Sequence, residues 1–351
     1  MSVLDLARPE LRALKGYSSA RMESSGGAVL LNANESPWTP YEEDALALNR
    51  YPEPQPPALI GKLCEIYRVA REQLLVGRGS DEMIDLLTRA FCRAGQDAVL
   101  IMPPTFGMYR VCAGIQGAAV REVPLLAEAD FQVDWLALQA AITPAVKLVY
   151  LCTPNNPTGG EFARAPLFAL LEKLRGRALV VVDEAYGEFS AQPSWSTELD
   201  KFEHLVVLRT LSKAYGLAGA RVGCALAHPE LIALLRKLIA PYPLPSPVVD
   251  AALRGLAEPE QVQARIVMLI SERERVRNAL QKHPAVDKVW PSAANFLCFR
   301  VDNAAARYAR LAAGGVVVRD VSHYLGLADC LRVSVGTREE NSRFLEALGA
   351  T

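Results

Sequence analysis

Apolar runs of strand length alternate with amphipathic segments through much of this 351-residue chain. Five of the runs are continuous, spanning residues 98–101, 147–151, 179–182, 205–208 and 222–226. Continuous runs are typical of parallel strands that are covered on both faces. The segments 80–87 and 165–171 have helical periodicity, and the first opens with a serine suited to capping a helix. Strands that alternate with helices predict an α/β fold with a mainly parallel sheet.

The pattern changes after the proline-rich segment 240–247, which predicts an extended connector. A long helix is expected at about 259–282, with the charged residues 272–275 on its solvent side. The last part of the chain is predicted to hold strands at 294–299, 315–319 and 330–335 and helices at 304–312 and from Thr337 onward. In the last helix Glu340 completes a capping box. This composition predicts a smaller α+β domain.

Composition narrows the class of protein. The hydrophobic fraction of 51% and charged fraction of 22% are those of a soluble globular protein. A net charge of -1 gives no reason to expect nucleic acid or anionic membrane as a partner. Neither a secretory signal nor an apolar run of membrane-spanning length is seen, so we expect a cytoplasmic protein. The seven scattered cysteines predict buried free thiols, and the four dispersed histidines predict no metal site.

Lys213 lies among hydroxyl-bearing and small residues, directly after the apolar run 205–208. Open α/β sheets bind ligands at the carboxyl ends of their strands, so we expect Lys213 in a binding site. A buried lysine loses its proton readily and forms Schiff bases. Arg221 stands beside glycines that allow close backbone approach, and it is suited to holding a phosphate. A reactive lysine beside a phosphate site is what pyridoxal phosphate (PLP) requires.

Three further motifs lie at expected strand ends. Asn156 belongs to a rigid proline-containing loop, which by itself is also typical of an ordinary turn. Asp183 follows the run 179–182, where it is suited to Mg²⁺, sugar hydroxyls, a protonated ring nitrogen or the cap of a helix. The glycines at 77 and 79 precede a helix start, and such a start offers free N–H groups to a phosphate.

Together with Lys213, these motifs resemble the fold-type I PLP-dependent aminotransferases, in the same order along nearly the whole chain. The resemblance implies a large domain with a mainly parallel sheet covered by helices, plus a smaller α+β domain. We expect residues 1–45 to form an N-terminal arm and part of the small domain. The large PLP-binding domain is expected at 46–245 and the small C-terminal domain at 246–351.

The resemblance assigns a role to each site residue. Lys213 would bind PLP covalently and move the proton, and Asp183 would pair with the pyridine nitrogen. Asn156 and Tyr186 would bond the ring hydroxyl oxygen. The ring face would lie on Phe106, where the family usually has tyrosine, so stacking is kept and a hydroxyl is lost. The phosphate would be held by the backbone N–H groups of Ser80 and Asp81, the hydroxyls of Thr210 and Ser212, and Arg221, because the Asp81 carboxylate itself would repel it.

Tyr51 matches a family tyrosine that reaches the phosphate from the partner subunit, which implies a homodimer with shared active sites. Several segments also resemble the histidinol-phosphate aminotransferases within this family. The substrate-binding residues implied are Tyr17, Asn34, Arg319 and Arg332. Arginine forks bind phosphate and carboxylate bidentately, so one pocket can serve histidinol phosphate and then glutamate or 2-oxoglutarate.

The activity expected is therefore PLP-dependent transamination of L-histidinol phosphate with 2-oxoglutarate in histidine biosynthesis. An aromatic amino-acid aminotransferase would use the same arginines on a carboxylate, and a phosphothreonine decarboxylase-like enzyme would use the same cofactor set. A transcription regulator built on a PLP-type domain is disfavoured because no DNA-binding segment is present. A Rossmann dehydrogenase is disfavoured by the missing glycine fingerprint.

Overall fold

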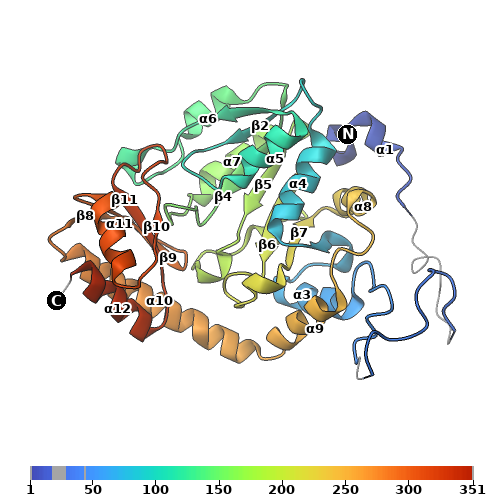
Figure 1. Ribbon diagram of the computed structural model, residues 1–351. Helices are drawn as coiled ribbons and strands as arrows, with labels where there is room; N and C mark the ends of the chain where they lie inside the picture. The colour runs from blue at the N-terminus through green and yellow to red at the C-terminus, as the bar shows by residue number, and fades with distance from the viewer. Residues whose placement is uncertain (1, 18–28, 43–44, 350–351) are drawn as a thin grey trace.

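The computed structural model describes residues 2–17, 29–42 and 45–349 (Figure 1). It contains a seven-stranded and a four-stranded sheet. The larger sheet comprises β1 (Leu74–Gly77), β2 (Ala98–Ile101), β3 (Ala119–Glu122), β4 (Val146–Cys152), β5 (Leu179–Asp183), β6 (Leu205–Thr210) and β7 (Gly223–Ala227). Their spatial order is β1-β7-β6-β5-β4-β2-β3. Strands β3, β2, β4, β5 and β6 pair in parallel, whereas β7 is antiparallel to both β6 and β1. The mainly parallel sheet predicted from the apolar runs is confirmed.

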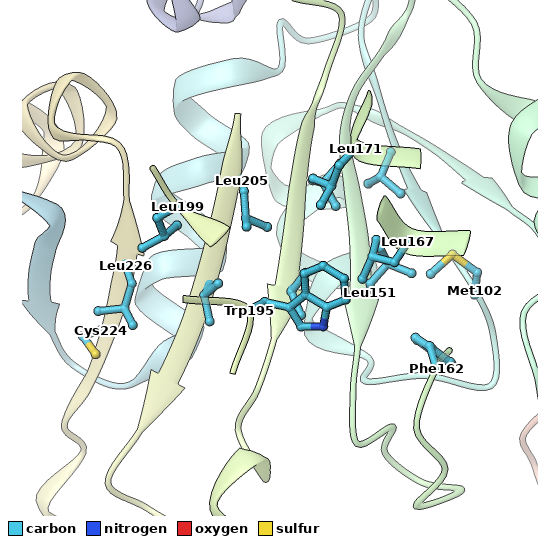
Figure 2. Packing of buried hydrophobic residues seen from close by; sticks show 14 of the residues in the cluster. Met102, Leu151, Phe162, Leu167, Leu171, Trp195, Leu199, Leu205, Cys224 and Leu226 are labelled. Atoms are coloured by element: carbon cyan, nitrogen blue, oxygen red, sulfur yellow. The ribbon is translucent and has the colours of Figure 1, made fainter. Parts of the chain in front are cut away.

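Helices cover both faces of the larger sheet. One face carries α3 (Pro57–Tyr67), α6 (Trp135–Ala141), α7 (Arg164–Leu174) and α9 (Ser246–Gly255), and the other carries α4 (Ser80–Phe91), α5 (Met108–Gln116) and α8 (Pro229–Leu238). Successive residues of a strand point to opposite faces. Figure 2 shows Leu151 of β4 and Leu205 of β6 on the first face, packed with Leu167 and Leu171 of α7. Burial on both faces explains why these strands are apolar throughout.

The four-stranded sheet lies beyond the long helix α10 (Pro259–Gln281), on the left of Figure 1. It comprises β8 (Val286–Val289), β9 (Phe296–Val301), β10 (Arg319–Asp320) and β11 (Cys330–Ser334), in the order β10-β11-β9-β8 and antiparallel throughout. Helices α11 (Ala304–Ala313) and α12 (Arg338–Leu348) pack on it. The predicted capping box opens α12, because Thr337 accepts from the Glu340 N–H and Glu340 accepts from the Thr337 N–H.

The expectation that residues 272–275 face solvent is wrong for two of them. Glu272 and Arg273 are buried in α10, with 6% and 8% of their surface exposed. The Glu272 carboxylate accepts hydrogen bonds from Arg275 and from Asn341 of α12, and Arg273 donates to the carbonyl of Ala294. Each buried charge therefore has a polar partner that a helical wheel does not reveal.

Two other expectations fail in detail. The strand expected at 315–319 pairs only at Arg319 and Asp320, because Gly315 and Val316 instead donate back to the carbonyls of Ala312 and Leu311 at the end of α11. Residues 1–45 were expected to contribute in part to the small domain, but the first described residues pack on helices of the larger sheet instead. The short helices η1 (Val3–Leu6) and α1 (Pro9–Arg12) lie near α4 and α8, and Val3 is buried in the core there (Figure 1).

The cysteines behave as expected, since all seven are free and only Cys64 is partly exposed. Within residues 2–17, 29–42 and 45–349, no helix is long and apolar enough to cross a membrane. Across the same ranges no group of three or more His, Cys, Asp or Glu side chains is placed to hold a metal ion.

Candidate active site

A cavity of about 250 Å³ opens where the parallel strands of the larger sheet reach their carboxyl ends. Its lining is contributed by the loops after β1, β2, β4, β5 and β6, with one residue from β11 of the smaller sheet. The lining residues are Ser80, Asp81, Phe106, Cys152, Asn156, Asp183, Ala185, Tyr186, Thr210, Ser212, Lys213, Arg221 and Arg332. Sequence reasoning placed all but two of these in the site. Strand ends are the place where open α/β sheets bind ligands.

Lys213 lies in the turn after β6, and its Nζ is 5.5 Å from the centre of the Tyr186 ring. The side chain reaches solvent through the cavity, in contrast to the buried lysine that the sequence suggested. Surrounding protein nevertheless lowers the pKa of Lys213 from its ordinary value, and the positive charge of Arg332 adds to the effect. Both influences disfavour the charged ammonium and so favour the nucleophilic amine.

Asp183 ends β5, and only 2% of its surface is exposed. Its Oδ1 accepts a hydrogen bond from the N–H of Ala185 at 3.0 Å, and its Oδ2 accepts one from the hydroxyl of Tyr109 at 2.7 Å. Burial raises the pKa of Asp183 from 3.8 to about 6, against the opposing effect of those two hydrogen bonds. Such a carboxylate gains from a cationic partner, because a positive charge offsets the cost of burial.

The side of the cavity at the start of α4 is built for an anion. Gly79 precedes that helix with φ 85°, and a Cβ there would lie 2.8 Å from Nη2 of Arg221. Thr210 Oγ1 and Ser212 Oγ are 3.0 Å apart, and Ser212 Oγ is 3.4 Å from Nη1 of Arg221. A helix N-terminus, two hydroxyls and a guanidinium are donors that bind a phosphate. The Arg221 pair with Asp81, at 3.1 Å, spans an exposed position and is weak enough to yield to a ligand.

Asn156 and Arg332 meet across the cavity, because Nη1 of Arg332 donates to Oδ1 of Asn156. The guanidinium carbon of Arg332 lies 5.1 Å from the centre of the Phe296 ring, and its Nε is buried without a hydrogen-bond partner among the residues that the structure describes. Because the Arg332 side chain lines the cavity and carries a positive charge, it favours an anionic ligand there. Tyr186, 6% exposed, packs its ring edge-on against Phe296 with centroids 5.1 Å apart.

The groups that line the cavity fit PLP. They are the amine of Lys213 with its lowered pKa, the buried acid Asp183 suited to a protonated ring nitrogen, and the aromatic ring of Phe106. The phosphate would be bound by the start of α4, Thr210, Ser212 and Arg221, which are called the phosphate seat below.

Four of the predicted site residues lie outside this cavity. Tyr17, Asn34 and Tyr51 line a second cavity of about 610 Å³, in which Tyr51 stacks on Tyr242 with ring centroids 4.6 Å apart. In Figure 1 the described residues 29–42 extend away from both sheets. Arg319 is exposed on β10, directly opposite Arg332 in the register of β10 and β11, so both side chains leave the same face.

Sequence reasoning missed three residues of the site. Cys152 and Ala185 line the cavity, and Tyr109 contacts Asp183 from behind it. The sequence could have indicated Cys152, because it ends an apolar run just before the loop that contains Asn156. Tyr109 belongs to the segment that contains Phe106, but only the rotation of α5 decides that its hydroxyl points at the acid.

The fold and the site define a class of protein, and sequence comparison names it. The family Aminotransferase class I and II matches residues 28–348. The chain belongs to this family, whose fold-type I architecture it shares. A histidinol-phosphate aminotransferase of Xanthomonas euvesicatoria pv. vesicatoria (strain 85-10) is 51% identical over 355 aligned positions, covering 100% of this chain and 98% of the relative.

Solved structures agree. The histidinol-phosphate aminotransferase of Sinorhizobium meliloti in complex with pyridoxal-5'-phosphate superposes with a TM-score of 0.77 at 26% identity, covering 90% of this chain and 88% of that chain. The histidinol-phosphate aminotransferase from Clostridium acetobutylicum has a TM-score of 0.79 at 23% identity, covering 86% of this chain and 90% of that chain. The second likeness speaks for the fold alone.

Proposed function

We propose that this protein is a PLP-dependent transaminase that converts L-histidinol phosphate and 2-oxoglutarate to imidazole-acetol phosphate and glutamate. The proposal rests above all on one cavity that combines Lys213, Asp183 and a phosphate seat, in a chain with close histidinol-phosphate aminotransferase relatives. When bound, PLP supplies an electron sink for the carbon that gives up its proton. The protein's own side chains supply attachment, orientation and proton movement.

Each residue has a chemical task in this proposal. Lys213 attaches the cofactor and afterwards takes the proton from the substrate carbon and returns it, a role that its lowered pKa favours. Asp183 keeps the cofactor's ring nitrogen protonated, and Asn156 and Tyr186 orient the ring through its hydroxyl oxygen. The backbone N–H groups of Ser80 and Asp81 at the start of α4, together with the hydroxyls of Thr210 and Ser212 and the guanidinium of Arg221, would hold the cofactor phosphate. Phe106 lies against the ring face.

Arg332 gives the site its preference for anionic substrates. Its Nε has no partner among the described residues, and its bond to Asn156 can be exchanged for one to a ligand oxygen. The guanidinium can donate two parallel hydrogen bonds either to a phosphate or to a carboxylate. Arg319, Tyr17 and Asn34 are proposed to complete the substrate site. One anion site thus serves histidinol phosphate in the first half-reaction and 2-oxoglutarate in the second.

A single-turnover absorbance experiment tests this proposal. The PLP-loaded protein is mixed separately with histidinol phosphate and with phenylalanine, and loss of the band of the lysine-bound cofactor is followed. Rapid loss with histidinol phosphate and much slower loss with phenylalanine supports the assignment. A faster reaction with phenylalanine would replace it with an aromatic amino-acid aminotransferase. The band should vanish in Lys213→Ala and persist in Lys62→Ala, whose lysine pairs with Glu65 on α3 away from the cavity.

We further propose a cytoplasmic homodimer with shared active sites. Tyr51 lies away from the PLP cavity of its own chain, in a segment that exposes 85% of Leu31 and 78% of Trp38. Exposed apolar side chains of this size favour contact with another protein surface. A second copy that covers them would bring Tyr51 to its phosphate seat. The free cysteines suit a reducing compartment.

Mixed dimers test the shared site. Lys213→Ala and Tyr51→Ala chains, each poorly active alone, are combined in equal amounts and refolded together. If Tyr51 acts on the partner's cofactor, a mixed dimer regains one native site, and about a quarter of all sites become native under random pairing. If Tyr51 serves its own chain, or the protein is a monomer, mixing restores nothing.

A further inference from the structure

Behind Asp183, on the side away from the cavity, the ring of Tyr109 is fully buried in α5. Its hydroxyl donates to Oδ2 of Asp183 at 2.7 Å, and such a bond is stronger when the carboxylate is ionised than when it is neutral. The Tyr109 ring stacks on that of Tyr150 from β4, with centroids 4.6 Å apart and planes 8° apart. Packing on a strand and within a helix therefore fixes where this hydroxyl points.

The carboxylate of Asp183 is held at both oxygens, because the backbone N–H of Ala185 donates to Oδ1. Without these donors a buried acid would lose its charge, since burial alone favours the protonated form. A protonated Asp183 would no longer act as the anionic partner of a cationic ring nitrogen. Of the two donors, Tyr109 is the side chain, and substitution can remove it.

We propose that Tyr109 is a positioning residue, whose hydroxyl orients the Asp183 carboxylate and keeps it ionised for the ring nitrogen of the cofactor. This inference rests on the function proposed above, because it assumes that Asp183 faces PLP. Tyr109 itself does not line the cavity. It acts through Asp183.

The charges around Asp183 make this hydrogen bond consequential. The hydrogen bond from Tyr109 lowers the pKa of Asp183, whereas burial and the nearby negative charges of Asp81 and Glu184 raise it. The titratable groups that influence Asp183 or are influenced by it are Tyr109 from α5, Cys152 and Tyr150 from β4, Asp81 from α4, Glu184 and Tyr186 after β5, and Lys213 after β6. Loss of the hydroxyl therefore shifts the balance toward the neutral acid.

The test compares Tyr109→Phe with Tyr150→Phe. Tyr150 is an equally buried ring in the same stack, but its hydroxyl meets Thr88 and the carbonyl of Ile84 and does not touch Asp183. Nitrogen NMR of PLP labelled at the pyridine nitrogen reports directly whether that nitrogen is protonated. Fluorescence titration of the apoenzyme measures the PLP dissociation constant.

In Tyr109→Phe we expect the pyridine nitrogen to lose its proton at lower pH than in the wild type, and PLP to bind about 10- to 100-fold more weakly. Tyr150→Phe should match the wild type in both readouts. Equal nitrogen titrations in Tyr109→Phe and the wild type, or an equal shift in Tyr150→Phe, would overturn the proposal. A wild-type protein that binds no PLP would instead defeat the proposed function.

A double-mutant cycle separates positioning from general damage to the fold. In an Asp183→Asn background the amide cannot ionise, so adding Tyr109→Phe should change PLP affinity by less than about twofold. If the second substitution weakens binding as much as it does in the wild type, Tyr109 acts independently of Asp183 and the inference is wrong. If Tyr109→Phe alone does not fold, the NMR titration is repeated with Tyr109→Leu against Tyr150→Leu.

Discussion

Asp183→Asn should make the cofactor-free protein more stable while making it a poor enzyme. Burial raises the pKa of Asp183 from 3.8 to about 6, so the folded state binds a proton more tightly than the unfolded state does. A group with a raised folded pKa favours folding at low pH, and this advantage is lost as the pH rises through the folded value. Ionisation of Asp183 therefore destabilises the fold increasingly as the pH rises above 3.8, and the full effect is reached above about pH 6 in the absence of a cationic partner.

The size of the effect follows from the two pKa values. Their difference corresponds to about 3 kcal/mol once the pH is well above 6, and about half of that is already present near pH 5. Asparagine does not titrate, so the unfolding free energy of Asp183→Asn relative to the wild type should rise by about 1–2 kcal/mol between about pH 5 and about pH 8. Urea denaturation of the two apoproteins at both pH values measures this difference.

Asp97→Asn is the control, because the pKa of Asp97 is shifted in the opposite direction from that of Asp183. Asp97 is also 2% exposed, but Arg93 hydrogen-bonds its carboxylate and the pKa of Asp97 is lowered. Its contribution to stability is present at neutral pH and is lost as the pH falls through its folded pKa. Asp97→Asn should therefore destabilise the protein most at neutral pH. The reasoning about Asp183 is refuted if Asp183→Asn shows no increase in relative stability between the two pH values, or follows the trend of Asp97→Asn.

Two further substitutions test the phosphate seat and the anion site. A Cβ at Gly223 would overlap the backbone nitrogen of Ser80 and lie 2.8 Å from Cα of Gly79. Gly223→Ala should therefore lower the unfolding free energy by about 1–3 kcal/mol and weaken PLP binding. Gly219→Ala is the control, because a Cβ there meets nothing within 4 Å. Both variants are measured by calorimetry and by PLP titration, and equal stability and equal PLP affinity of the two variants would refute the overlap argument. Arg332→Gln should raise KM for both substrates about 10- to 100-fold, because a charged hydrogen bond to each anion is lost. Arg300→Gln on β9, whose guanidinium lies over Trp290, should leave both KM values unchanged in steady-state assays.

Much of the larger sheet could be predicted because its strands are buried on both faces. The run Leu179–Asp183 is apolar up to the acid at its end, which predicts both a central strand and the position of a polar group at its carboxyl end. The direction of β7 could not be predicted in this way. An antiparallel strand that is buried on both faces has the same apolar pattern as a parallel one, and only its pairing with β6 and β1 distinguishes them.

The residues that sequence missed depend on contacts between distant segments. Glu272 was expected in solvent because charged residues usually are, and its partner Asn341 lies on a helix much later in the chain. The relation of Tyr109 to Asp183 depends on the rotation of α5 over the sheet. Motifs near Lys213 were recognisable because local spacing places them on strand ends. Tyr51 and Tyr17 carry no such local signal, and in the structure they line a second cavity.

Strand β1 pairs with β7 so that Gly77 lies opposite Gly223, at the sheet edge beside the phosphate seat. The start of α4 is therefore held in place by a strand that the ribosome makes long after it. Until residue 227 has emerged, Ser80 has no packed neighbour at β7 and Arg221 has no fixed position beside it. The phosphate seat therefore cannot be assembled from an N-terminal fragment that ends before β7. Native pairing of such distant segments is also what makes a sheet slow to fold.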